Sequence, residues 1–262
     1  MTSAPPDYGI DAPPVIRNLL LAAGAGLILA IVLQVADVPY PGGFPLRDMA
    51  LGAFAGCLLS AGGMLWYSKV RKVRARERFL NLVPWRGDEQ VLDIGCGRGL
   101  LLLGAAKRLT TGKSVGVDIW QTEDLAGNNP EATTENARRE GVADRIELHT
   151  ADARQLPFPD GSFDVVLSSL ALHNIYDTAE RQQAIREIAR VLKPGGCVVL
   201  IDIRHTTEYA RVLRECGLAD IERAATSGWT WPVLLMTMGT VHPCCVTGHK
   251  PPPLPVPETP AR

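Results

Sequence analysis

Residues 91–99 read VLDIGCGRG, a short apolar run followed by three glycines at alternate positions. The run VLDI, at 91–94, has the length and the apolar, β-branched character of a buried strand. Glycines at a strand-to-helix turn adopt positive φ and let the backbone approach a ligand closely. The apolar periodicity of GLLLLGAAKRL (99–109) then predicts a helix. This stretch therefore predicts a strand, a ligand-binding loop and a helix, the opening unit of an α/β sheet.

Strands and helices are predicted to alternate along residues 85–205. The further elements expected are strands at 114–118, 145–150, 163–169 and 197–203, and helices at 130–140 and 178–192. Gly141 stops the first of these helices, and Asp177 with Glu180 forms a capping-box-like start for the second. The alternation predicts an open, mostly parallel sheet with helices on both faces. Residues 217–250 fit an antiparallel edge pair that closes the sheet.

The glycine loop does not fit a nicotinamide dinucleotide site. That fingerprint has glycines at its first, third and sixth positions, and the sixth position counted from Gly95 is Leu100. Asp93 lies inside the strand end, where a pyrophosphate site would gain nothing from another negative charge. A carboxylate at that position suits a ligand with an amino or cationic group. Asp118 ends the second strand, where an acid accepts hydrogen bonds from both ribose hydroxyls. Asp152 is a third acid, after the third strand.

Taken together, these motifs resemble those of class I S-adenosylmethionine-dependent methyltransferases. The segments VLDIGCGRG, VGVD, the Asp152-Ala153 pair, FDVVLSS and VLKPGG match that family in order and spacing over roughly residues 85–205. The similarity is to the small-molecule branch that includes quinone and sterol methylases. The resemblance implies a Rossmann-like, mostly parallel seven-stranded sheet with S-adenosyl-L-methionine as the cofactor.

The resemblance also implies a role for each matching residue. Asp93, Gly95 and Gly97 would line the methionine moiety, Asp118 would hold the ribose, and Asp152 would accept from the adenine amino group. The expected cofactor-binding set is Asp93, Gly95, Cys96, Gly97, Asp118, Ile119, Trp120, Asp152, Ala153, Ser168 and Ser169.

Two loops carry candidates for contact with the methyl acceptor. After the second strand, Trp120 either covers the adenine, lines the acceptor pocket or only packs, and Asp124 and Asn128 either cap the loop or act in the site. After the fourth strand, His173 has the intrinsic pKa of a general base. The alternative for His173 is a structural histidine that fixes the loop by hydrogen bonds. His205, after the fifth strand, is a weaker candidate base.

The first part of the chain has a different character. Residues 18–36 and 49–68 contain no charged residue, and each is long enough to span bilayer hydrocarbon of roughly 30 Å as a helix. Residues 37–48, rich in proline and glycine, suit a short turn between two spans. The small residues expected to permit close helix approach are Ala22, Gly26 and Ala30 in the first run and Gly52 and Gly56 in the second. We predict a transmembrane hairpin, with a cleaved signal peptide and a buried or interfacial helix as alternatives.

Basic residues follow the second apolar run. The segment KVRKVRARER (69–78) has six basic residues against one acid, whereas Arg47 is the single basic residue of the turn. The positive-inside rule therefore places both termini and the remainder of the chain in the cytoplasm, for example at a cell inner membrane. The basic run is either attracted to anionic lipid headgroups or is a solvated helix face. Trp66 and Tyr67 stand where an interfacial aromatic belt would lie.

Composition narrows the function classes further. The 262 residues carry a net charge of -1, which argues against a dedicated nucleic-acid binder. The six cysteines fit neither a disulfide scaffold nor a zinc pattern, so no metal is expected. The adjacent Cys244 and Cys245 have two interpretations, thiol or arsenic chemistry and a late strand with buried cysteines. The second is favoured.

These observations predict five segments and one leading function. The segments are an N-terminal tail (1–17), a transmembrane hairpin (18–68), a basic linker helix (69–84), a methyltransferase domain (85–250) and a proline-rich disordered tail (251–262). The leading hypothesis is a membrane-anchored methyltransferase acting on a small, lipophilic acceptor, with membrane lipids as further partners. The rivals are a non-catalytic S-adenosylmethionine-binding regulator and a nicotinamide oxidoreductase. The stretch Trp229–Met238 either packs on the sheet, caps the pocket or touches the membrane.

Overall fold

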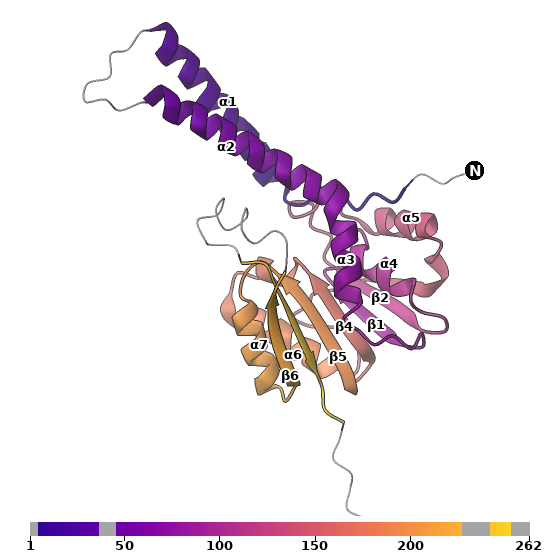
Figure 1. Ribbon diagram of the computed structural model, residues 1–262. Coiled ribbons are helices and arrows are strands. Elements are labelled where there is room, and N and C mark those ends of the chain that lie inside the picture. The colour runs from indigo at the N-terminus through magenta and orange to yellow at the C-terminus, as the bar shows by residue number, and fades with distance from the viewer. Residues whose placement is uncertain (1–4, 37–45, 227–241, 253–262) are drawn as a thin grey trace, which may run out of the picture.

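A computed structural model describes residues 5–36, 46–226 and 242–252 (Figure 1). Two long N-terminal helices project from an α/β domain, and a helical continuation of the second joins the two parts. Three predicted features lie outside the described residues: most of the turn at 37–48, the stretch Trp229–Met238, and nearly all of the tail at 251–262.

The domain contains a seven-stranded mixed sheet in the order β3-β2-β1-β4-β5-β7-β6. The strands are β1 (Gln90–Ile94), β2 (Lys113–Asp118), β3 (Ile146–Thr150), β4 (Phe163–Ser169), β5 (Leu192–Asp202), β6 (Ala219–Ala225) and β7 (Cys244–His249). The first five pair in parallel, and β7 lies antiparallel to both β5 and β6. The predicted parallel sheet with an antiparallel edge pair is therefore confirmed.

Helices cover both faces of this sheet. They are α4 (Leu100–Ala106), α5 (Pro130–Glu140), α6 (Thr178–Val191) and α7 (Thr206–Glu215). Leu92 and Val166 point to a core shared with α6 and α7, whereas their neighbours Val91 and Val165 point to a core shared with α4. This alternation follows from the two-residue period of a strand. Both faces are thus apolar, as the nearly continuous apolar strands predict.

Local signals in the sequence set two helix boundaries as predicted. The Asp177 carboxylate accepts a hydrogen bond from the Glu180 backbone N–H at 2.9 Å, which caps α6. Gly141 ends α5 with φ of 70°, a left-handed conformation that favours glycine.

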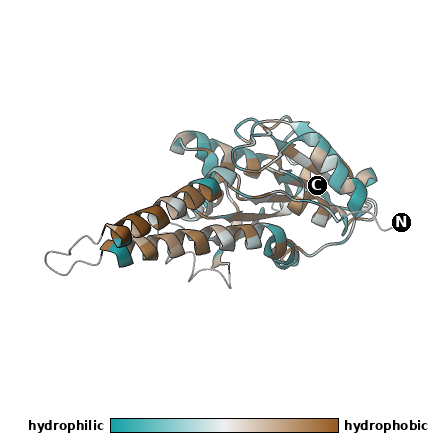
Figure 2. Ribbon diagram, turned by 90° about the horizontal axis from the view of Figure 1, so that it is seen from above, coloured by the Kyte–Doolittle hydropathy of each residue, from teal (hydrophilic) through white to brown (hydrophobic). Residues whose placement is uncertain are grey.

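The N-terminal hairpin consists of α1 (Pro13–Val35) and α2 (Leu46–Trp66). A π-helical turn (Tyr67–Arg71) and α3 (Lys72–Leu80) continue α2, so one helical segment runs from Leu46 to Leu80. Both segments are long and apolar enough to cross a membrane, with mean hydropathies of 2.2 and 1.6 over their most apolar windows. Only 11% of each window is buried, and hydrophobic residues run along the surface of both helices (Figure 2).

Small residues do bring α1 and α2 together, but not all of those predicted. A Cβ at Gly26 would lie 3.0 Å from the Ala50 carbonyl oxygen, so the backbones approach closely there. The buried residues of α1 near this contact are Ala23 and Ala30, whereas Ala22 is exposed. The packed face therefore consists of Ala23, Gly26 and Ala30, which are spaced by three and then four residues. A strict spacing of four residues does not stay on one face, because an α-helix has 3.6 residues per turn.

The predicted glycine motif of α2 lies outside this contact. A Cβ at Gly52 or Gly56 would meet nothing within 4 Å, and both glycines are exposed. The prediction that Gly52 and Gly56 permit close approach within the hairpin is therefore wrong.

Residues 5–12, which we call the N-terminal strap, cross from the hairpin to the domain. Tyr8 is 5% exposed, and its hydroxyl donates to the Glu140 carboxylate at 2.7 Å. Lys72 Nζ donates to the carbonyl oxygens of Tyr8 and Gly9 at 2.8 and 2.9 Å. Arg76 donates to the Tyr8 hydroxyl at 2.9 Å. The strap is thus held between α3 and α5.

These contacts change the interpretation of the basic run. Lys72 and Arg76 are 4% and 5% exposed and bind the strap, so they do not form a lipid-facing or solvated surface. Lys69, Arg74 and Arg78 remain exposed on the same helical segment. The basic run is therefore divided between buried residues that bind the strap and exposed residues, because only one face of this helix points away from the domain.

Candidate active site

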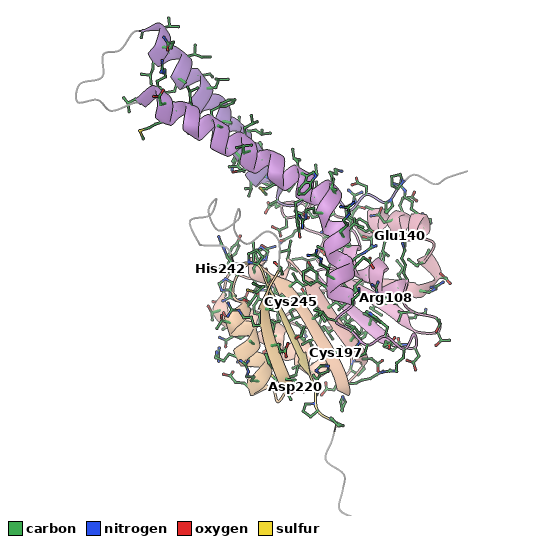
Figure 3. The ribbon with its side chains drawn as sticks, viewed as in Figure 1. Arg108, Glu140, Cys197, Asp220, His242 and Cys245 are labelled. Carbon is green, nitrogen blue, oxygen red and sulfur yellow. The ribbon has the colours of Figure 1, made fainter. Side chains whose placement is uncertain are left out.

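The predicted cofactor residues gather at the carboxyl edge of the parallel strands. In the sheet order, β1 and β4 are neighbours although β2 follows β1 in the chain, and ligands of open α/β sheets bind at such a switch point. Figure 3 gives the direction of this edge, because Cys197 lies at the middle of β5 and Cys245 pairs with Ile201 near the end of that strand. Cys245 lies nearer the hairpin than Cys197 does, so the carboxyl edge faces the hairpin.

The glycine loop needs glycine at two positions for different reasons. Gly95 and Gly97 have φ of 67° and 52°, and both are left-handed. A Cβ at Gly95 would lie 2.2 Å from the Ala171 Cβ, so this glycine lets the loop approach the segment after β4. A Cβ at Gly97 would lie 2.8 Å from Leu125 Cδ2, in the loop after β2.

Asp118, at the end of β2, organises the site. Its Oδ2 accepts from the Gly97 backbone N–H at 2.7 Å, and its Oδ1 accepts from the Trp120 backbone N–H at 2.6 Å. The Asn128 side-chain amide also donates to Oδ1, at 3.2 Å. The buried Oδ1 of Asn128 has no hydrogen-bond partner within the part of the chain that the structure describes. A ligand hydroxyl beside Asp118 and Asn128 would supply the donor that this oxygen needs.

Three other predicted residues face inward. Asp93 is 2% exposed and accepts from the Leu102 backbone N–H at 2.8 Å, and burial raises the pKa of Asp93 to about 8. The Ser168 hydroxyl donates to the Ile94 carbonyl oxygen at 2.9 Å. The Cys96 thiol is buried, which raises its pKa. In this structure these side chains support the loop and α4, and their predicted contact with the cofactor stays a prediction.

Trp120 is held in a strained conformation directly after β2. Its φ is 61°, which costs a non-glycine residue about 1 kcal/mol or more. Its indole N–H donates to the Thr150 hydroxyl at 2.9 Å, so the ring reaches across to the end of β3. Leu170 and His205, which follow the ends of β4 and β5, also have positive φ. Strained residues therefore cluster at the carboxyl edge. Ile119, between Asp118 and Trp120, is half exposed at the same edge.

Asp152 and Ala153 follow β3 at the same edge. The Asp152 carboxylate accepts from the Arg154 backbone N–H at 2.8 Å and from Arg154 Nε at 3.0 Å. The hydrogen bond from the Arg154 guanidinium lowers the pKa of Asp152. Ala153 packs against the core beneath it, and Ser169 is half-buried at the end of β4.

His173 pairs with an acid that sequence reasoning missed. Its backbone N–H donates to Asp202 Oδ2 at 3.1 Å, and its ring Nδ1 lies 2.6 Å from Asp202 Oδ1, outside the angular range of a linear hydrogen bond. Asp202 ends β5 and also accepts from the Tyr209 hydroxyl at 3.1 Å. The reasoning that selected Asp118, an acid at the end of a strand, would also have selected Asp202.

Two other candidates have different surroundings. Burial raises the pKa of the Asp124 carboxyl, and the charge of nearby His173 opposes that rise. Asp124 therefore lies within electrostatic reach of His173. His205 directly precedes α7, its Nδ1 lies 3.9 Å from Glu208 Oε2, and burial lowers the pKa of its ring. Cys244 and Cys245 are buried in β7, and burial raises the pKa of Cys245 to about 12, which favours the structural interpretation of this pair.

The strap reaches this site through residues that the sequence did not single out. Asn136 accepts from the Asp7 backbone N–H at 2.9 Å and donates to the carbonyl oxygens of Asp7 and Arg98 at 2.9 and 3.0 Å. Arg98, inside the glycine loop, pairs with the Asp7 carboxylate at 3.4 Å and donates to the Ala126 carbonyl oxygen at 3.3 Å. The strap thus contacts both loops of the cofactor site.

Comparison with known proteins agrees with this geometry. Residues 92–200 match the family described as methyltransferase domain. The 27-O-demethylrifamycin SV methyltransferase of Amycolatopsis mediterranei is 36% identical over 159 residues, 59% of this chain and 52% of that protein. The demethylmenaquinone methyltransferase of Symbiobacterium thermophilum is 36% identical over 141 residues, 52% of this chain and 50% of that protein. The chain spans about half the length of the curated relatives it matches.

A solved structure covers more of the chain. SpnF, a (4+2)-cyclase, superposes with a TM-score of 0.54 at 20% identity over 88% of this chain and 96% of its own. That likeness supports the fold alone. Over residues 92–200 the α/β domain is therefore similar to S-adenosylmethionine-dependent methyltransferases. S-adenosyl-L-methionine is its methyl donor, and the unpartnered Asn128 oxygen beside Asp118 fits the ribose of that donor.

Proposed function

We propose that this protein is anchored in a membrane by its hairpin and methylates a small, lipophilic acceptor at the cytoplasmic face. The observation that carries the proposal is that the carboxyl edge of the sheet faces two exposed, apolar, membrane-length helices. A relative named for demethylmenaquinone supports an acceptor of this kind. The exposed Lys69, Arg74 and Arg78 support the cytoplasmic orientation.

The chain's residues would mainly position the reactants. S-adenosyl-L-methionine supplies an electrophilic methyl group on a sulfonium, and transfer by in-line displacement depends on alignment. Asp118 and Asn128 would hold the ribose, and the glycine loop would let the backbone approach the methionine moiety. Asp152 would accept from the adenine amino group. Trp120 would border the adenine or the acceptor.

His173 would act on the acceptor. Its Nδ1 faces Asp202, so Nε2 is the nitrogen left to accept a proton from a hydroxyl or amine nucleophile. Asp202, which accepts from the His173 backbone N–H and lies beside Nδ1, would position the ring.

This role predicts a large effect of one substitution. His173→Ala is expected to lower kcat about 100-fold or more while the Kd for S-adenosylmethionine stays unchanged. The measurements are steady-state kinetics and calorimetry, with Tyr176→Ala as the control because Tyr176 is highly exposed in the same loop. An unchanged kcat would leave His173 the structural role of fixing its loop.

The proposal is tested by transfer of a labelled methyl group from S-adenosylmethionine to membrane extracts, followed by identification of the labelled product. We expect label in an extractable, apolar small molecule. Binding of S-adenosylmethionine without methyl release in any extract would favour a non-catalytic regulator. Tighter binding of NADH than of S-adenosylmethionine would favour an oxidoreductase.

A further inference from the structure

An apolar groove lies at the base of the hairpin, where α1 leaves the strap. Its volume is about 380 Å³, and it is lined by Ile10, Pro13, Ile16, Leu20 and Leu65, with Arg17 as the charged residue. The walls come from the strap, α1 and α2, so the groove belongs to the junction and not to the sheet.

The groove is connected to the cofactor site through the strap. The Ile10 carbonyl oxygen accepts from the Ala126 backbone N–H at 3.0 Å, and the Ala12 backbone N–H donates to the Asp124 carbonyl oxygen at 2.8 Å. Leu125, between these two partners, is the residue that lies over Gly97. The loop at 124–126 therefore contacts the strap, which lines the groove, and also contacts the glycine loop.

The same loop leads toward the acceptor side of the site. The Asp124 carboxyl lies within electrostatic reach of His173, as the opposing influence of that histidine on the Asp124 pKa indicates. The strap that lines the groove is thus hydrogen-bonded to the loop at 124–126, and this loop carries Asp124, which senses His173.

The position of Arg17 indicates where a ligand would enter. Arg17 lies near the start of the apolar helix α1 and has no hydrogen-bond or ion-pair partner that the described residues provide. A cation at the start of a membrane-length helix lies at the level of the lipid headgroups. The groove therefore opens at the boundary between bilayer hydrocarbon and the domain.

We propose that this groove binds the part of a linear apolar tail that adjoins the reactive head of the methyl acceptor. The head would lie at the carboxyl edge near His173, and the remainder of the tail would stay in the bilayer. The inference rests on the proposed function, because it takes the acceptor to be lipophilic. It gives the hairpin a part in acceptor recognition besides anchoring.

Kinetics with acceptors of different tail length test the proposal. The full chain in nanodiscs is assayed with reduced 1,4-naphthoquinones that carry no tail or one, two or four isoprene units. Because a tail segment held in the groove reduces the cost of aligning the head with the cofactor, we expect KM, expressed per lipid, to fall by about tenfold up to two units. We expect no further fall from two to four units, since those carbons stay in lipid. A KM independent of the first two units would overturn the proposal.

Filling the groove provides the matched comparison. Leu20→Trp is expected to raise KM for the two-unit acceptor about tenfold and to leave KM for the tail-less acceptor and the Kd for S-adenosylmethionine unchanged. Leu29→Trp is the control, because Leu29 is exposed on the same helix outside the groove. Leu65→Ala, which removes one wall, should raise the same KM if the tryptophan variant does not fold. Equal effects of Leu20→Trp and Leu29→Trp would contradict the assignment.

A photoreactive probe separates failure of this inference from failure of the proposed function. Geranylgeraniol with a diazirine near its alcohol is cross-linked to the full chain in nanodiscs, and adducts are mapped by mass spectrometry. We expect adducts within residues 10–21 that Leu20→Trp suppresses and Leu29→Trp does not. Such adducts without methyl transfer would uphold the groove and reject the acceptor. Methyl transfer with adducts spread evenly along α1 would reject the groove alone.

Discussion

The hairpin and the α/β domain use the same apolar residues in opposite ways. Leu59 in α2 is 69% exposed, whereas Leu102 in α4 is fully buried. The domain hides its leucines between helix and sheet, so its stability comes from apolar burial in water. Apart from Ile16 beside the strap, the buried residues of the hairpin are alanines, and an exposed apolar surface of that size requires another covering. Hydrophobicity alone therefore does not distinguish the hairpin from the core of the domain, but the pattern of burial does.

The difference between the two regions is tested most strongly by a variant that lacks the hairpin but keeps the strap. The Asp11 backbone N–H donates to Ser68 Oγ at 3.1 Å, so a Gly/Ser linker of about four residues can replace residues 13–66. We expect this variant to be soluble without detergent and to bind S-adenosylmethionine within about threefold of the full chain. Ultracentrifugation and calorimetry are the measurements. Recovery of the full chain in the soluble fraction without detergent would contradict the membrane interpretation.

A truncation that begins near Arg78 is a useful comparison. From the sequence alone, such a chain is expected to be soluble and to bind the cofactor. The structure predicts weaker binding than the linker variant, because the truncation removes the strap, Lys72 and Arg76. Equal affinity in the two variants would show that the strap does not support the cofactor loops.

On the domain side, the largest expected effect is at Asp118. Asp118→Ala removes the acceptor for the Gly97, Trp120 and Asn128 donors and for the ribose. Because charge-assisted hydrogen bonds contribute about 1.5–3 kcal/mol each, we expect the Kd for S-adenosylmethionine to rise about 10- to 100-fold. Calorimetry measures it, with Asp144→Ala as the control because that side chain is 77% exposed. An unchanged Kd would remove Asp118 from the site.

A smaller effect is expected where the two regions are joined. Asn136→Ala leaves the Asp7 backbone N–H and two carbonyl oxygens without their partner. We expect the free energy of unfolding to fall by about 1–3 kcal/mol, and the Kd for S-adenosylmethionine to rise a few-fold because Arg98 is in the glycine loop. Chemical unfolding in detergent measures the free energy of unfolding, and calorimetry measures the Kd. Glu131→Gln, an exposed change on α5, should leave both quantities unchanged.

The smallest predicted effect is a pH dependence that originates in the domain. Burial raises the folded-state pKa of Asp93 to about 8. From roughly pH 4 to 8 the folded state therefore holds a proton that the unfolded state releases, so stability falls as pH rises. We expect a loss of about 1–2 kcal/mol between pH 6 and 8. Asp93→Asn should flatten this slope in urea unfolding, and an unchanged slope would assign it to other groups.

Most of the domain could be predicted because its signals are local. Gly141, Asp177 and the glycines of the loop act within a few residues, and the central strands are short, nearly continuous apolar runs. Asn136, Arg98 and Tyr8 were not found, because their partners lie far away in the chain and look like ordinary surface or linker residues. The division of the basic run had the same cause, since Lys72 and Arg76 are buried by the strap.

The central claim is that the hairpin delivers a lipophilic acceptor to the methyltransferase domain. The most direct measurement compares labelled methyl transfer by the full chain in nanodiscs with transfer by the linker variant, using the same membrane extract. We predict that both bind S-adenosylmethionine, but that the full chain labels the apolar acceptor at least about tenfold faster. Equal rates in the two proteins, or label confined to water-soluble products, would contradict the account.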